Sequence, residues 1–212
     1  IEILQHLRMR FPGVVRITTY ARSHTVARIA DDRLKAIANA GLNRLHIGME
    51  SGSDAVLKMV QKGTTQQQHV KAGKKAVAAG IELSEYVMPG LGGRALSRSH
   101  ALETADALNQ INPDYIRLRT LAIPGSVPLF EDYQAGRFEK LTDIEAAEEI
   151  LLFLQNLEGI ASRVRSDHIL NLFEDIQGTL PEDKERMTGV IEAFLSMSPH
   201  DRMLYQVGRR LG

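Results

Sequence analysis

The chain has 212 residues, 43% of them hydrophobic, and its 26 basic residues balance 26 acidic ones. A chain of this size can bury one good core, and its even charge leaves no overall positive field for a nucleic acid backbone, so we expect one main domain with a tail and no nucleic acid partner. No apolar stretch approaches the roughly 20 residues of a membrane span and the first residues carry no secretion signal, which predicts a cytoplasmic protein without a membrane partner.

The chain contains no cysteine. It can therefore form no disulfide and supply no thiolate ligand to a metal ion or an iron-sulfur cluster. The seven histidines show no clustered spacing, so we also predict no metal site. The chain opens on Ile1 inside a stretch with the apolar spacing of a helix, and we expect it to be a piece of a longer protein.

Apolar, β-branched runs alternate with helical segments along the chain, which is the pattern of βα units and a parallel sheet. The expected strands cover residues 14–20, 45–49, 81–88, 115–121 and 160–165. The expected helices cover about residues 32–40, 53–63, 65–80, 97–110 and 142–157, with capping residues at Ser53, Thr65, Ser97 and Thr142. The remainder is expected to be mostly helical, with Pro181 at a helix start and a break at residues 198–199.

Successive strand residues point to opposite faces, and the two faces of these strands differ in polarity. The apolar face carries Leu45, Ile47, Met49, Ile116 and Leu118. The polar face carries Arg16, Thr18, Tyr20, His46, Gly48, Glu50, Arg117 and Arg119. Polar faces on several strands favour a wide or open barrel interior that holds water and ligand. A polar face turned to solvent is the alternative, which we disfavour because parallel sheets are usually covered on both faces.

The segment His-Ile-Gly-Met-Glu-Ser-Gly-Ser-Asp at residues 46–54 ends a strand and opens a helix. It places Glu50 and Ser51 at the carboxyl edge of the sheet, where ligands bind in such folds. The Glu50 carboxylate is suited to accept hydrogen bonds from ribose hydroxyls or from an ammonium group. Helix capping explains Ser53 and Asp54 but leaves Glu50 without a structural reason.

Three segments follow one another in a familiar order: HIGMESGSDAVLKMVQKG, AAGIELSEYVMPGLGG and YIRLRTLAIPGSVPLF. Their sequence resembles the latter strands of radical S-adenosylmethionine (SAM) enzymes of the Elongator-catalytic-subunit and methylthiotransferase type, over about residues 14–136. The resemblance implies an α/β fold: a partial (β/α) TIM-like barrel with parallel strands, truncated at its N-terminus, over residues 1–165. Residues 166–212 would form a mostly helical C-terminal extension.

In that family, a 4Fe-4S cluster on a CxxxCxxC loop cleaves SAM to a 5′-deoxyadenosyl radical. The resemblance thus implies SAM as a cofactor, and for the full-length protein a 4Fe-4S cluster and an electron donor such as flavodoxin or ferredoxin. The substrate, a small molecule or another class, stays unknown. Because the cluster cysteines are absent, we expect their segment to lie before residue 1 and this chain alone to be inactive.

The resemblance also suggests the SAM contacts. Glu50 matches the glutamate expected near the SAM ribose or methionine amine, and Ser84 lies on the next strand. Gly90 belongs to the loop over residues 87–93 that matches the adenine-lining loop, and Ile123 follows the strand after it. Ser51, next to Glu50, completes this set.

Several charged side chains at strand ends are further candidates. Arg22 could reach the SAM carboxylate or a substrate acid, with surface solvation as the alternative. Arg117 and Arg119 share a face and suit a carboxylate or a phosphate, and Arg119 joins the cofactor set. A structural ion pair with Glu82 or Glu85 is the alternative. Asp167 and His168 are candidates for a base or a substrate contact, with a structural role as the alternative.

Two other functions stay open. One is a cluster-free relative that binds SAM or a nucleoside as a regulatory module. The other is a TIM-barrel enzyme that binds a phosphate with the glycine-rich loop at residues 88–94. That loop lacks the GxGxxG order and the P-loop lysine, so its phosphate signal is weak.

Overall fold

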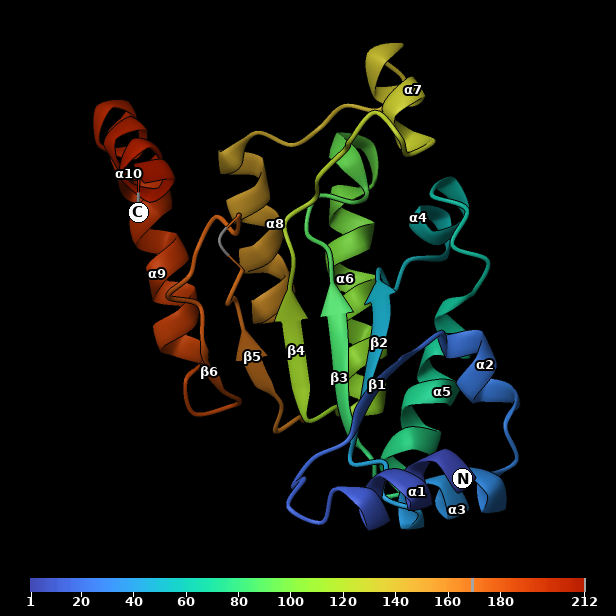
Figure 1. Cartoon of the computed structure of the whole chain (residues 1–212). Coiled ribbons are helices and arrows are strands. Elements are labelled where there is room, and N and C mark those ends of the chain that lie inside the picture. Colours follow the sequence, from blue (N-terminus) through green and yellow to red (C-terminus); the bar gives the residue numbers. More distant parts are fainter. Residues whose placement is uncertain (169, 212) are drawn as a thin grey trace.

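A computed structural model describes residues 1–168 and 170–211 of the chain. Its strands are β1 (Thr18–Ala21), β2 (Arg44–Glu50), β3 (Glu82–Val87), β4 (Tyr115–Leu118), β5 (Arg163–Arg165) and β6 (Gly178–Thr179). They form one open sheet in the order β1-β2-β3-β4-β5-β6 (Figure 1). Neighbours from β1 to β5 are parallel, and β6 is antiparallel to β5. The predicted α/β class with a parallel, unclosed sheet is confirmed.

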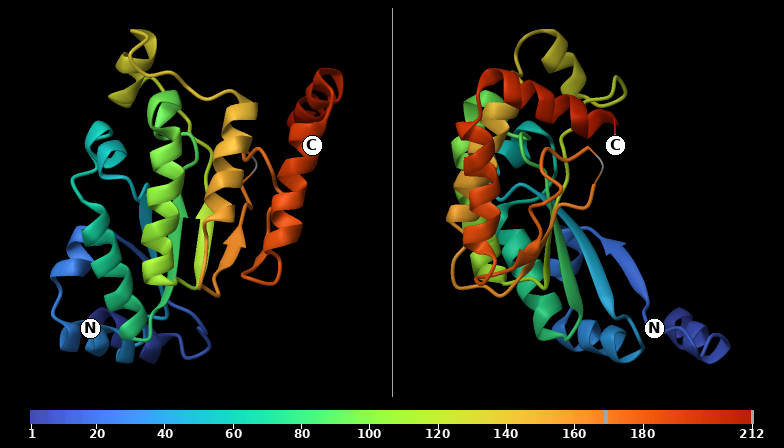
Figure 2. Two further views of the ribbon diagram at one scale, coloured as in Figure 1. Left: turned by 180° about the vertical axis from the view of Figure 1, so that it is seen from behind. Right: turned by 90° about the vertical axis from the view of Figure 1, so that its left-hand side faces the viewer.

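The helices connect these strands and lie mostly on one side of the sheet. They are α1 (Glu2–Arg10), α2 (Ser23–Arg28), α3 (Asp31–Asn39), α4 (Asp54–Met59), α5 (Gln66–Ala78), α6 (Gly93–Ile111), α7 (Leu129–Gln134), α8 (Asp143–Gln155), α9 (Lys184–Ser196) and α10 (Pro199–Leu211). The left view of Figure 2, from behind, shows α5, α6, α8 and α9 in front of the sheet, while no helix of the described residues covers β2, β3 and β4 on the other face.

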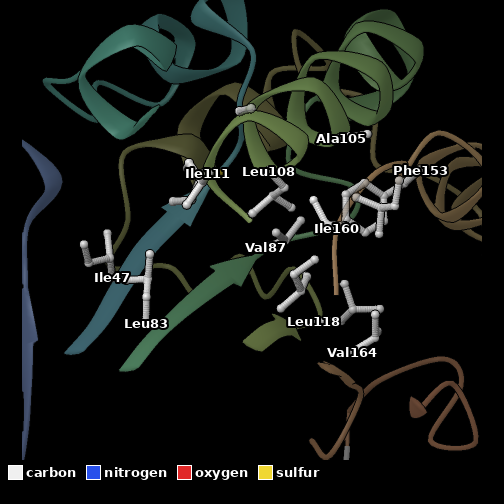
Figure 3. Packing of buried hydrophobic residues seen from close by; sticks show 14 of the residues in the cluster. Ile47, Leu83, Val87, Ala105, Leu108, Ile111, Leu118, Phe153, Ile160 and Val164 are labelled. Carbon is white, nitrogen blue, oxygen red and sulfur yellow. The ribbon is translucent and has the colours of Figure 1, made fainter. Parts of the chain in front are cut away.

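The core lies between the sheet and this helix layer. The apolar strand side chains predicted to pack under helices are buried there, with Leu45 3%, Leu118 2%, and Ile47, Met49 and Ile116 0% exposed. Figure 3 shows Val87 of β3 on the side of the sheet that Leu108 of α6 covers. Each large aliphatic side chain buried in this way stabilises the fold by about 1.5–3 kcal/mol.

Local sequence signals placed some helix ends correctly. Thr142 and Glu145 form the predicted capping box of α8, and the Thr65 hydroxyl accepts a hydrogen bond from the Gln68 amide at the start of α5. Gly80 and Gly159 follow their helices with φ of 78° and 68°, a conformation that glycine adopts without a steric penalty.

Other expected boundaries were wrong. α6 begins at Gly93, and Ser97 lies inside it with its hydroxyl bonded to Glu149 rather than to the helix start. α9 begins at Lys184, three residues after Pro181. The first strand is shorter than expected because residues 14–17 lie outside the paired region, and Val15 is 90% exposed. The pairing of β6 was not anticipated, since two residues are too few to show an alternating pattern.

The segment after residue 165 shares the sheet and the core of the preceding residues. β6 pairs with β5, and Phe173, Ile176, Ile191 and Phe194 belong to the main buried cluster. The division into two parts at this position stays a prediction. None of the described helices combines the length and the apolar character needed to cross a membrane.

Candidate functional site

One face of the sheet gathers polar and aromatic side chains. Pairing aligns Tyr20 with His46, Ser84 and Tyr115, and in the next row Gly48 with Tyr86, Arg117 and Arg165. These residues alternate with the buried apolar ones, so they define the face that the helix layer leaves uncovered, called here the polar sheet face. Ring contacts across three strands agree: the His46 ring centroid lies 4.9 Å from that of Tyr20 and 5.4 Å from that of Tyr86.

Glu50 lies at the carboxyl end of β2, on this polar sheet face. Its φ is 64°, and the pairing register with β3 shifts between Gly48 and Glu50. A Cβ atom on Gly48 would lie 3.3 Å from the Glu50 Oε1 atom, so the carboxylate lies above that glycine. The side chain is 30% exposed. The bulge therefore turns Glu50 toward the uncovered face rather than under the helices.

One cation pairs with this carboxylate, and a second lies in the groove that the first also lines. The Lys62 ammonium lies 2.5 Å from the Glu50 Oε1 atom. A groove at the ends of β1 and β2 is lined by Lys62, Gly48 and the exposed Arg22. The structure thus places the predicted residues Glu50 and Arg22 near each other, at the carboxyl ends of β1 and β2. It adds Lys62, which lies in a loop after α4 and which no sequence pattern singled out.

A second charged cluster lies at the ends of β4 and β5. The Arg117 Nη1 atom is 2.8 Å and the Arg119 Nη1 atom 3.0 Å from the two Asp167 carboxylate oxygens. Partial burial disfavours the charged form of Asp167, but the Arg119 hydrogen bond and the charges of both arginines outweigh it and lower the pKa of this carboxyl. Asp167 is therefore an ion-paired carboxylate and a weak base.

Neither of the alternative partners considered for these arginines, Glu82 and Glu85, is available to them. Glu82 forms two hydrogen bonds of 2.8 Å with Arg44, and Glu85 is fully buried on the helix side of β3. His168, beside Asp167, is half-buried, and its Nδ1 atom accepts a hydrogen bond from the Leu170 amide. The two arginines are ion-paired, but with Asp167 rather than with the glutamates that were the alternative.

Ser51 and Ser84, both predicted to contact the cofactor, are fully buried. The Ser51 hydroxyl is 3.0 Å from the Ser53 amide, which donates to it, and 2.8 Å from His100 Nδ1. The Ser84 hydroxyl has no hydrogen-bond partner among the described residues. Neither hydroxyl exposes surface, and the contacts of Ser51 and Ser84 with the cofactor stay a prediction.

A pocket at the ends of β3 and β4 contains two further predicted residues. It encloses about 90 Å³ and is lined by Gly90 and Arg119, by Ala146 and Ile150 of α8, and by Leu172 and Phe173. Ile123 is not part of its lining; it packs against a separate apolar cluster with Leu121 and Phe138. The structure therefore brings Gly90 and Arg119 together and leaves Ile123 apart.

A buried polar network holds the loops after β2 and β3 in place. The Glu149 carboxylate of α8 accepts hydrogen bonds from the Gly90 amide at 2.6 Å and from the Ser97 hydroxyl at 2.5 Å. His100 of α6 links Ser51 to the Met88 carbonyl, with Nε2 3.1 Å from that oxygen. Both His100 and Glu149 are nearly inaccessible to solvent.

Burial sets the protonation of this network, which we call the loop-holding network. Burial raises the pKa of Glu149 to about 7, against the hydrogen bonds from Ser97 and Gly90, and burial lowers the pKa of His100 to about 4. His100 is thus neutral at pH 7, so its 3.7 Å approach to Glu149 is not an ion pair. Sequence inspection missed both residues because they lie within ordinary helical patterns.

Comparison with known proteins identifies the family. The sequence model of the Radical SAM superfamily matches residues 1–107, half of the chain. The chain belongs to the radical SAM superfamily. A tRNA uridine(34) acetyltransferase from Methanocaldococcus infernus is 21% identical over 122 residues, which are 57% of this chain and 23% of that protein.

Solved structures support the same radical SAM fold. Elp3 of Methanocaldococcus infernus, with residues 1–46 deleted, superposes with a TM-score of 0.60 at 16% identity, covering 85% of this chain and 41% of that one. Methylornithine synthase (PylB) superposes with a TM-score of 0.51 at 15% identity, covering 96% and 65%. The chain thus spans less than two thirds of each of these relatives, and the structural likeness concerns the fold.

Proposed function

We propose that this chain supplies the SAM-binding latter strands of a radical SAM enzyme that acts in the cytoplasm on a substrate still unknown. The observation that carries the proposal is the position of Glu50: a partly exposed carboxylate at the carboxyl end of β2, above Gly48 and on the polar sheet face. Ligands of parallel α/β folds bind at this edge of the sheet. Membership of the radical SAM superfamily makes SAM the ligand to test there.

The residues of this chain suit the two cofactors of the family unequally. No cysteine is present among its 212 residues, so it lacks the thiolates that hold a 4Fe-4S cluster, and we derive no step through such a cluster. In the proposed enzyme those ligands, and the contact with an electron donor such as flavodoxin or ferredoxin, come from a part of the protein outside this chain. SAM, when bound, supplies the 5′-deoxyadenosyl group.

The groove at Glu50 does suit SAM. The carboxylate accepts hydrogen bonds from an ammonium or from ribose hydroxyls, and Lys62, its present partner, shows that a cation is stabilised at this position. Arg22 in the same groove provides a guanidinium for the SAM carboxylate. In this arrangement Glu50 orients the ligand, while the loop-holding network keeps the turn at Gly90 in its position.

The phosphate-binding alternative loses support from the glycine-rich loop itself. The Gly90 amide already donates to the Glu149 carboxyl group, so it is not available to a phosphate oxygen. The cluster-free regulatory module stays a rival. An extended protein that includes the preceding segment distinguishes the two, because a radical SAM enzyme would bind iron and sulfide under anaerobic reconstitution and release 5′-deoxyadenosine with dithionite.

The binding experiment is a calorimetric titration of this chain with SAM. Glu50→Gln removes the negative charge with little change of shape, and we expect at least a roughly tenfold loss of affinity, as for a charge-assisted hydrogen bond. Glu148→Gln, on the exposed side of α8, is the matched control and should bind SAM as the parent does. Equal affinities of the two variants would remove Glu50 from the site.

A further inference from the structure

Beside Glu50, the polar sheet face carries a continuous aromatic and basic surface. The Tyr20 and Tyr86 rings are nearly parallel, with an interplanar angle of 18° and centroids 6.3 Å apart. The Arg119 guanidinium lies 4.8 Å from the centroid of the Tyr86 ring. Tyr20 is 74% exposed, an unusual exposure for a side chain with so much apolar surface. We call these three residues the ring platform.

Positive charge is in excess beside the ring platform, at the ends of β4 and β5. Arg117 and Arg119 share one carboxylate, Asp167, so the cluster keeps an excess positive charge. The Arg117 Nε atom is buried and has no hydrogen-bond partner among the described residues. His46, which touches both tyrosine rings, does not offset this charge, and its own positive form is disfavoured: burial, followed by the charges of Arg117 and Arg44, lowers its pKa.

Such a surface selects ligands by two features together. A flat ring stacks on tyrosine and on the guanidinium plane, whereas a saturated ring or a chain makes poorer contact. An acidic group gains a charge-assisted, two-pronged contact from the arginine pair. The Asp167 carboxylate shows where such a group fits, because it occupies that position from within the chain, and its 38% exposure leaves it able to move aside.

We infer that the ring platform binds a planar ring compound carrying an acidic group, either a carboxylate or a phosphate ester, and that this compound class is the substrate. Its role as substrate rests on the proposed function, whereas its binding does not. The ring lies against Tyr20, and the acidic group meets Arg117 and Arg119 in place of Asp167. The ligand then lies on the same face as Glu50, across the strands from β1 to β4.

The first test titrates the chain with benzoate, phenyl phosphate, benzyl alcohol and cyclohexanecarboxylate, observed through the tyrosine ring signals by NMR. We expect benzoate or phenyl phosphate to bind, and the tighter of the two identifies the acidic group. Benzyl alcohol lacks the acid and cyclohexanecarboxylate lacks the flat ring, so each should bind at least about tenfold more weakly. Binding of benzyl alcohol as tight as that of the acids would overturn the inference, and so would no binding by either acid.

Variants locate the binding on the platform. Tyr20→Ala and Arg119→Gln should each lower the affinity for the tighter-binding acid by about tenfold. The matched controls Tyr133→Ala on α7 and Arg33→Gln on α3, both at exposed positions, should leave that affinity unchanged. Asp167→Asn should tighten binding, because it removes the internal competitor for the arginines. Unchanged affinity in both Tyr20→Ala and Arg119→Gln would show that the acid binds elsewhere.

The same variants separate this inference from the SAM proposal. Glu50→Gln should lose SAM and keep the aromatic acid, and Tyr20→Ala should do the reverse. If the parent protein binds SAM but neither aromatic acid, the ring platform is contradicted and the SAM proposal stands. Absence of SAM binding together with acid binding that depends on Arg119 contradicts the SAM proposal instead.

Discussion

The buried carboxyl of Glu149 makes a quantitative prediction about stability and pH. Burial raises the pKa of Glu149 from 4.5 to about 7 in the folded chain. Between these values the folded protein keeps a proton that the unfolded protein has lost. The contribution is therefore fully present below pH 4.5 and is lost as the pH rises to about 7. At 1.36 kcal/mol for each pH unit, the loss amounts to about 3 kcal/mol.

Glu149→Gln isolates this contribution. The glutamine amide oxygen can still accept from Gly90 and its nitrogen can donate to Ser97, while the proton equilibrium is removed. The difference in unfolding free energy, variant minus parent, should rise by about 3 kcal/mol between pH 4.5 and pH 8. His100 and His69 titrate in both proteins, so their effects largely cancel in the difference.

The assay is urea unfolding followed by circular dichroism at pH 4.5, 6, 7 and 8. Glu148→Gln, one residue away on the exposed side of α8, is the matched control, and its difference from the parent should stay flat across this range. If the Glu149→Gln difference is equally flat, the carboxyl titrates normally and the description of the loop-holding network as a buried proton-binding site is refuted.

Four further substitutions test other parts of the structure. Burial lowers the pKa of His69 to about 4, so its contribution to stability is present above pH 6.5 and is lost as the pH falls, by about 3 kcal/mol. His69→Leu should remove this loss of stability at acid pH. Urea unfolding at pH 7 and pH 4.5 measures the change. Glu85→Met should stabilise the chain increasingly above pH 4.5, because burial raises the pKa of Glu85 and its ionised form is disfavoured in the core; equal pH profiles would contradict this. Thr142→Ala should cost about 1 kcal/mol through loss of the α8 capping box, measured as a lower urea midpoint. Gly52→Ala should cost about 1–3 kcal/mol, because its Cβ would lie 2.6 Å from the Thr104 Cα atom, whereas Gly13→Ala meets nothing within 4 Å and should leave the thermal midpoint unchanged.

Sequence patterns predicted those features of the fold that depend only on residues close together in the chain. Alternation along β2 and β4 separated Ile47 and Ile116 from His46 and Arg117, because pleating alone assigns neighbouring residues to opposite faces. The capping box at Thr142 lies within four residues and could be read directly. Ser97 misled the prediction because a serine that bonds to a distant carboxylate looks the same in sequence as a helix cap.

The candidate site was predictable only where it followed a strand end. The position of Glu50 followed from the order strand, glutamate, helix. The partners of the charged groups did not, because Arg119 and Asp167 are 48 positions apart and Gly90 and Glu149 are 59 apart. Ser84 shows the same limit: its strand was predicted, but the neighbours that bury it come from other strands.

The two borders of the sheet differ in what they offer to another chain segment. β6, with only two residues, is a short antiparallel end that gives little backbone for further pairing. β1 is twice as long, parallel to its neighbour, and carries threonines, which favour extended backbone. An additional strand would therefore join this sheet at one border only. It would pair beside Thr18–Ala21 and extend the polar sheet face on the side nearest Tyr20.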